Sequence, residues 1–254
     1  MAEPGARPNG RRLFAQYVYA PNALGYCGPA DAKALVSTAC GHDTTTDLTP
    51  IARRFSGAWP YQQLVARLSG RPDPLHEHVV RAYWTGNDLT ESIDRAEFGA
   101  QLLDRFATQA GAYWKHLTPD LLAEAAPTHA FHVFGVYPWS RLLETGAPQP
   151  LDVLDSCRIG LGRVTSLRPE GAVVRTRRLE YDGQLRLRPA DERVVRYRTD
   201  EGTFVADLRV GDVVALHWDF VCDRLTPEQA EGLEYWTDWQ LERTNVRLGN
   251  ASAR

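Results

Sequence analysis

The sequence predicts an α+β protein in which a mostly helical N-terminal domain precedes a small OB-like β-barrel with a C-terminal helix. Near residue 150 the hydrophobic repeat changes from the period of helices to the period of strands. Turn signals then divide the second part into short strands, and a helix-start signal follows the last of them. We therefore expect a disordered N-terminus over residues 1–10, a helical domain over 11–150, and the barrel with its helix over 151–246.

Amphipathic helices account for the first part. In residues 60–70, Tyr61, Leu64 and Val65 fall on one face of a helix. Residues 73–87 and 91–117 show the same helical spacing, and turn-forming clusters separate the three segments. The chain contains no internal repeat, so a solenoid is not expected.

Alternating strands account for the second part. Residues 165–179 and 184–188 flank the Asp-Gly turn at 182–183, which is a strong hairpin signal. A second turn over 199–202 separates two further strands, and residues 212–218 form the last one. Because several short strands in about 70 residues leave exposed edges unless they close, we expect a small closed barrel.

A capped helix follows the last strand. Thr226 can serve as N-cap, Pro227 suits the first helical position, and Gln229 can complete a capping box. Beyond them an apolar stripe runs along the helix, and it contains Leu233, Trp236 and Leu241.

Composition excludes several functional classes. The formal net charge of −3 argues against general nucleic-acid binding, and no apolar run is long enough for a membrane span. The polar N-terminus lacks the apolar centre of a signal peptide. The four cysteines form no C-x-x-C pair. We therefore expect reduced thiols and a cytoplasmic protein that binds neither membrane nor nucleic acid.

Cys157 and His217 are the candidate metal ligands. Cys157 lies where the helical part gives way to the first strand, and His217 lies on the last strand. Since the first and last strands of a small barrel can be neighbours, the thiolate and the imidazole could meet at one rim. Together they would suit a soft or borderline metal such as iron.

Cys27 and His132 are secondary candidates. Cys27 comes just before a predicted helix, where the helix dipole would favour a thiolate of lowered pKa. His132 stands three residues after His129, ahead of a run, VFGVYP, that suggests an extended segment. The alternative function is an enzyme with a thiolate or metal site between the domains, built from Cys27, His132 and His42. A plain interaction module is a third possibility.

The barrel segment resembles a known family. The stretch CRIGLGRV begins at Cys157, LRVGDVVALH ends at His217, and FVCDRL then leads into the capped TPEQA helix at Thr226. This order resembles the HypC/HupF family of small hydrogenase-maturation chaperones. The resemblance covers the last third of the chain, whereas LGYCGPAD and FHVFGVYPW are similar to an uncharacterised bacterial family. Two departures stand out: the family cysteine follows the initiator methionine, and Leu161 occupies the place of a family proline.

The resemblance implies an accessory protein rather than an enzyme. Members of that family help to assemble the iron centre of nickel–iron hydrogenases. By this analogy Cys157 would engage the iron fragment that carries CO and cyanide, and His217 would be its neighbour. Iron would be bound transiently, and the partners would be the hydrogenase large subunit, a maturation scaffold protein, or both.

Overall fold

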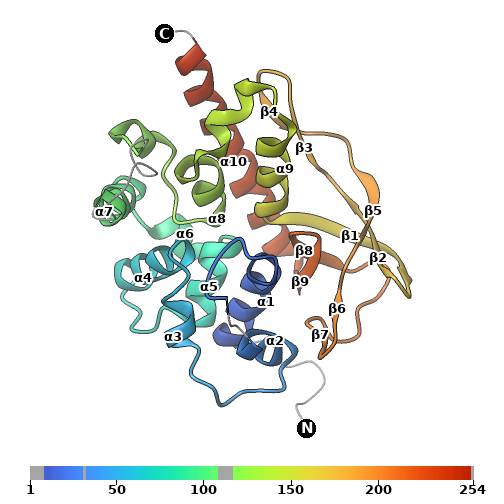
Figure 1. Ribbon diagram of the computed structural model, residues 1–254. Coiled ribbons are helices and arrows are strands. Elements are labelled where there is room, and N and C mark those ends of the chain that lie inside the picture. Colours follow the sequence, from blue (N-terminus) through green and yellow to red (C-terminus); the bar gives the residue numbers. More distant parts are fainter. Residues whose placement is uncertain (1–8, 31–32, 108–116, 253–254) are drawn as a thin grey trace.

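A computed structural model describes residues 9–30, 33–107 and 117–252 of the chain. The α+β class is confirmed: helices make up the first part, an antiparallel sheet follows, and a long helix ends the chain (Figure 1). Residues 1–8 of the predicted disordered N-terminus lie outside the described residues. Asn9 is described, and its side chain caps the first helix by accepting a hydrogen bond from the Arg12 N–H.

The helical part contains the three predicted segments. They correspond to α4, α5 and α7, although residues 108–116 at the end of the third segment lie outside the described residues. The α-helices before the sheet are α1 (Gly10–Ala23), α2 (Lys33–Cys40), α3 (Thr49–Ala52), α4 (Ala58–Leu68), α5 (Glu77–Trp84), α6 (Asp88–Ser92), α7 (Arg95–Ala107), α8 (His129–Phe131) and α9 (Pro148–Cys157). Between them lie the 3₁₀ segments η2 (Pro119–Glu124) and η4 (Pro138–Thr145) and the π-helical η3 (His132–Val136).

The strands form one five-stranded sheet and two small hairpins. The five-stranded sheet has the strand order β5-β2-β1-β8-β9. It consists of β1 (Gly160–Arg168), β2 (Gly171–Thr176), β5 (Asp191–Val195), β8 (Val213–His217) and β9 (Phe220–Arg224). The predicted Asp-Gly hairpin is β3 (Leu179–Tyr181) with β4 (Leu185–Leu187). The predicted turn over 199–202 joins β6 (Arg198–Thr199) to β7 (Gly202–Thr203).

The prediction of a closed barrel was wrong. β5 and β9 are the two edges of the sheet, and the contact between these edges is an isolated parallel bridge from Arg196 to Phe220. The chain leaves β5 immediately before this bridge and turns into the β6–β7 hairpin. A continuous ladder therefore cannot form between the edges, and the described strands remain an open sheet.

Helix α10 (Pro227–Ser252) contacts both parts of the molecule, including α8, η3, β1 and β4 (Figure 1). Its predicted capping box is confirmed: the Thr226 N–H donates to Gln229 Oε1, and the Gln229 N–H donates to Thr226 Oγ1. The predicted stripe is buried, with Leu233, Trp236 and Leu241 each at most 5% exposed.

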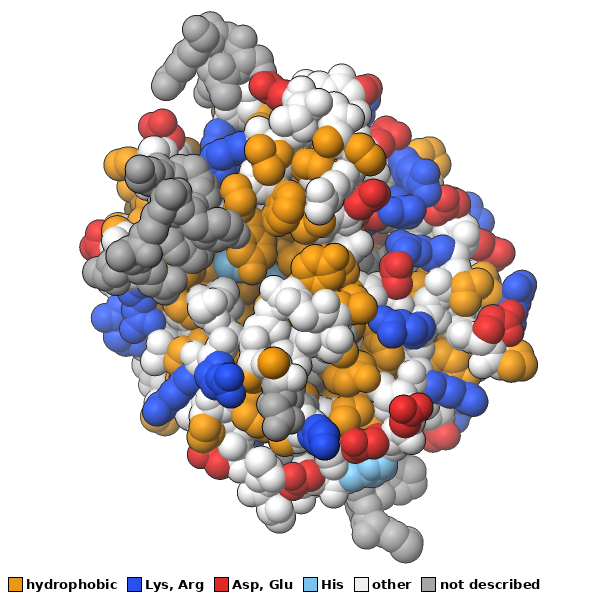
Figure 2. All heavy atoms as spheres, in the orientation of Figure 1, with side chains coloured by type: hydrophobic (Ala, Val, Ile, Leu, Met, Phe, Trp, Pro, Cys, Tyr) orange, Lys and Arg blue, Asp and Glu red, His pale blue; other side chains and the backbone are white. Residues whose placement is uncertain are grey.

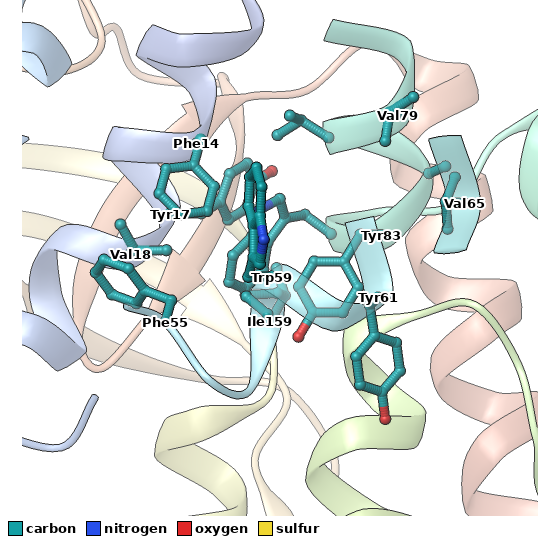
Figure 3. Close-up of a cluster of buried hydrophobic side chains, with 14 of the residues drawn as sticks. Phe14, Tyr17, Val18, Phe55, Trp59, Tyr61, Val65, Val79, Tyr83 and Ile159 are labelled. Atoms are coloured by element: carbon teal, nitrogen blue, oxygen red, sulfur yellow. The ribbon is translucent and has the colours of Figure 1, made fainter. Parts of the chain in front are cut away.

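One main hydrophobic core contains residues from both sides of the predicted domain boundary at residue 150. Figure 3 shows Tyr17 from α1, Tyr61 from α4 and Tyr83 from α5 around Trp59 and Ile159. Other members of the same cluster come from β8, β9 and α10. The division into two domains stays a prediction. Within the described ranges, none of the helices combines the length and apolar character that crossing a membrane requires.

Candidate metal centre

The pairing of β1 with β8 brings Cys157 and His217 together. Gly160 of β1 pairs with Leu216 of β8, so the last residue of α9, Cys157, lies beside the end of β8. The Trp218 N–H then donates to the Ser156 carbonyl at 2.9 Å, which fixes the end of β8 to the end of α9. The predicted neighbours therefore meet, although an internal strand pairing does this rather than barrel closure.

His129 joins these two residues. One donor atom from each of His129, Cys157 and His217 lies within 4.8 Å of the others, and all three residues are buried. The rings of His129 and His217 meet edge to face with centroids 5.2 Å apart. A thiol and two imidazoles in one cluster form a donor set that suits iron, zinc, cobalt or copper and disfavours magnesium or calcium.

His217 presents a free nitrogen to the cluster. Its Nδ1 lies 2.7 Å from the Tyr17 carbonyl oxygen, and because a carbonyl only accepts, Nδ1 carries the proton and donates. This leaves a lone pair on Nε2, which is buried and meets no hydrogen-bond partner in good geometry, although the Cys157 backbone lies near enough to the ring to raise its pKa slightly. A backbone carbonyl that fixes the tautomer of a histidine is the usual support for a metal-ligating imidazole. His217 therefore fits a metal as the protein stands.

His129 is held more tightly. Its Nε2 donates to the Cys157 carbonyl oxygen at 2.8 Å, and its Nδ1 accepts from the Tyr83 hydroxyl at 2.9 Å. Both nitrogens are thus engaged, and binding a metal at Nδ1 would require Tyr83 to turn away. His129 can act as a ligand only by exchanging one buried hydrogen bond for a metal bond.

The cluster is uncharged in the absence of a metal. Burial raises the pKa of the Cys157 thiol, and the nearby Cys27 raises it further. Burial lowers the pKa of His217 to about 4 and that of His129 well below its usual range. At neutral pH the thiol is protonated and both imidazoles are neutral. A bound cation would favour the thiolate form of Cys157, so the thiol would lose its proton.

His132 lies near the cluster but is not one of its three members. The expected extended segment was wrong: His132 begins the π-helical η3, directly after the single turn of α8. Its ring lies 6.0 Å from the His129 ring and 4.2 Å from the Tyr137 ring, measured between centroids. Burial lowers its pKa to about 3, and its Nδ1 has no hydrogen-bond partner.

The expected low pKa of Cys27 was wrong. Burial raises the pKa of this thiol to about 12. The described part of helix α2, Lys33–Cys40, does not include Cys27. Cys27 nevertheless lines the same cavity as Cys157 and His217. His42 is exposed, lies beside Gly202 and does not line this cavity.

A cavity of about 200 Å³ adjoins the cluster. His129, His132, Cys157, His217 and Cys27 all line it, mostly together with aromatic side chains, and no charged side chain of the described residues does. Figure 2 shows hydrophobic side chains gathered around a hollow on one face of the molecule. Tyr26 and Trp218 also line the cavity and stack with ring centroids 3.8 Å apart.

Sequence reasoning missed His129 as a ligand and Tyr83 as its partner. The three-residue spacing between His129 and His132 was a usable signal, because residues three apart on a helix are neighbours. No sequence signal pointed to Tyr83, whose hydroxyl reaches the cluster only through the packing of α5 against α8.

Comparison with known proteins places the chain in a family. Residues 6–251 match the Family of unknown function (DUF6390), and the chain belongs to this family. No curated protein matches the chain, and no solved structure does.

Proposed function

We propose that this member of the DUF6390 family binds a divalent transition-metal ion, foremost iron, through Cys157, His217 and His129. The observation that carries this proposal is the free Nε2 of His217, buried without a partner beside a buried thiol. A buried polar atom without a hydrogen bond destabilises the fold, and a metal ion would satisfy it. The uncharged cavity beside the cluster leaves room for small additional ligands on the metal.

The proposed biological role is accessory. Iron, as a fragment that carries CO and cyanide, would be a transient cargo destined for a nickel–iron hydrogenase. The resemblance of the segment from Cys157 to Ala230 to the HypC/HupF chaperones supports this role, and two of the three residues of the cluster, Cys157 and His217, belong to that segment. The hydrogenase large subunit or a maturation scaffold would be the partner, in the cytoplasm, and the helical part would supply partner specificity.

Metal binding is tested with purified, metal-free protein. Fe²⁺ is titrated under anaerobic conditions, and metal content and thermal unfolding are both measured. A metal that binds only the folded state stabilises it by about 2.7 kcal/mol when the free ion is at 100 times its Kd. We expect this gain for the wild type and its loss in Cys157→Ser and His217→Gln. Cys40→Ser is the matched control, since Cys40 lies beside Thr199 and does not line the cavity.

The same measurements can also refute the metal site. If the wild type gains no stability from Fe²⁺, Zn²⁺ or Co²⁺, the site is refuted. If Cys157→Ser and His217→Gln bind iron as tightly as the wild type, the metal lies elsewhere.

The accessory role needs a separate test in the native host. The tagged protein is purified under oxygen-free conditions while the hydrogenase is expressed, and co-purifying chains are identified by mass spectrometry. Recovery of the large subunit or scaffold, reduced in Cys157→Ala, supports the role. Recovery of neither partner contradicts it and leaves metal binding to stand alone.

The alternative is an enzyme that uses Cys27 and His132. The observation in its favour is that both residues line the cavity beside the metal cluster. The high pKa of Cys27 argues against an unassisted thiolate nucleophile at neutral pH. A turnover that survives Cys157→Ala and is lost in Cys27→Ala would favour this alternative over the accessory role.

A further inference from the structure

The cavity beside the cluster lacks the charge that a divalent ion needs. No Asp, Glu, Lys or Arg of the described residues lines it, and the histidines of the cluster are neutral ligands. With Cys157 as its only anionic ligand, a divalent ion would leave one net positive charge in a buried, aromatic-lined space. An uncompensated buried charge is strongly unfavourable. A second anionic ligand would make the complex neutral.

Cys27 is the second thiol in this cavity. It lines the same cavity as Cys157. Its sulfur is not one of the three donor atoms that lie within 4.8 Å of one another. The loop that carries Cys27 therefore has to move inward for its sulfur to join them.

The loop around Cys27 is built to hold the thiol over the cavity. The Asn22 side-chain amide donates to the carbonyl oxygens of Cys27 at 2.7 Å and of Pro29 at 2.8 Å, so one residue secures both sides of the turn. Gly25 and Gly28 both have φ near +78°, at +79° and +77°, a conformation that glycine adopts without strain. These two residues flank the short segment that would carry the sulfur inward.

An aromatic pair links this loop to the metal cluster. Tyr26, 57% exposed, stacks on Trp218, which follows His217 directly. An inward shift of Cys27 would carry Tyr26 along the face of Trp218. This sliding of one ring over the other breaks no hydrogen bond between the two residues. The stack thus covers the cavity while permitting the loop to slide.

We propose that Cys27 is the second thiolate ligand, so that Cys27, Cys157, His129 and His217 bind a divalent ion as a neutral, four-coordinate site. The inference rests on the proposed metal site and concerns the bare divalent ion, because a fragment that carries cyanide would bring its own negative charge and ligands. Zinc, iron and cobalt accept two thiolates and two imidazoles in a tetrahedral arrangement. Each thiol loses its proton as its sulfur binds the ion, and solvent takes up both protons, so no redox step is involved. The site would accordingly exclude magnesium and calcium.

Cobalt supplies the spectroscopic test. Metal-free protein is titrated anaerobically with Co²⁺ while the sulfur-to-cobalt charge-transfer absorption and the visible bands are recorded. Each bound thiolate contributes its own charge-transfer intensity, so at saturation Cys27→Ser should fall to about half of the wild-type intensity per cobalt. Cys40→Ser should match the wild type, and Cys157→Ser should lose the binding site.

A second measurement needs no variant. X-ray absorption of the zinc-loaded wild type counts sulfur ligands at about 2.3 Å from the metal, and we expect two. A single sulfur ligand, or an unchanged cobalt band in folded Cys27→Ser, would overturn the inference and leave the proposed metal site intact. Failure of the wild type to bind cobalt or zinc at all would instead refute the proposed site and this inference with it.

Discussion

Buried neutral histidines should make the metal-free protein sensitive to mild acid. Burial lowers the pKa of His217 to about 4 and that of His132 to about 3, from 6.5 in the unfolded chain. Because the folded pKa is the lower one, the unfolded state binds protons first as the pH falls. The stabilising contribution is therefore complete above pH 6.5 and is lost progressively below it.

The size of the loss follows from these values. For each histidine, the free energy of unfolding changes by RT times the logarithm of the ratio of proton-binding polynomials in the two states. Between pH 8 and pH 5 the free energy of unfolding therefore falls by about 2 kcal/mol for His217 and by about 2 kcal/mol for His132. Together the two residues remove about 4 kcal/mol, a large part of the 5–15 kcal/mol typical of a folded protein.

Urea unfolding of the chelator-treated protein at pH 8 and pH 5 measures this loss. His217→Gln and His132→Gln should each reduce the difference by about 2 kcal/mol, because each variant lacks one of the buried titrating groups, and buried His129 adds to the remainder. His42→Gln is the matched control, since His42 is exposed, and it should retain the full difference. If both variants lose as much stability on acidification as the wild type does, the assignment of the effect to these imidazoles is refuted.

Three further predictions concern the supports of the site. Gly86→Ala places a Cβ 2.2 Å from Trp236 Cδ1, at a residue with φ +79°, and should destabilise the protein by about 3 kcal/mol. Gly146→Ala is the control: its φ is also positive but its Cβ meets nothing, so it should cost about 1 kcal/mol. Equal losses of the two variants in urea unfolding would contradict this prediction. Asp155→Asn leaves the buried Arg158 without its carboxylate and should cost about 3 kcal/mol by the same assay, whereas an unchanged stability would exclude this role. Tyr83→Phe removes the hydroxyl bound to His129 Nδ1 and should cost about 1 kcal/mol of stability. Zinc affinity, measured by calorimetry, should rise because the metal no longer has to displace this hydrogen bond, and a lost affinity would contradict this.

The local features of the fold were largely predictable from the sequence. Hydrophobic period located α4, α5 and α7, the Asp-Gly turn located the β3–β4 hairpin, and the Thr226 cap located the start of α10. Barrel closure was not predictable, since it depends on where the chain leaves β5, and the residues around Arg196 carry no signal for that departure. Strand periodicity reports which residues face a core, but it does not report which strands become edges.

The site itself was predictable in part. Cys157 and His217 could be paired because they were expected at the first and last strands of a closed barrel. The pair is correct but the reason is not, since β1 and β8 are neighbours inside an open sheet, where Gly160 pairs with Leu216. The role of His129 could not be derived, because η3 was read as extended and the hydrogen bonds of His129 come from Tyr83 and from the Cys157 backbone. Contacts of this kind join residues far apart in the chain, and no local pattern encodes them.

The proposed metal binding would be energetically coupled to the docking of the two parts of the chain. His217 is oriented by the Tyr17 carbonyl of α1, and Cys157 accepts from His129 through its own carbonyl, so each donor is held by a segment from the other part. Without a metal, this arrangement maintains neutral imidazoles and a protonated thiol at the expense of acid stability. A divalent ion would satisfy the free Nε2 of His217 and link α8, α9 and β8 at one point. Its binding free energy would then add directly to the free energy of folding, which is why metal loading and resistance to mild acid should rise together.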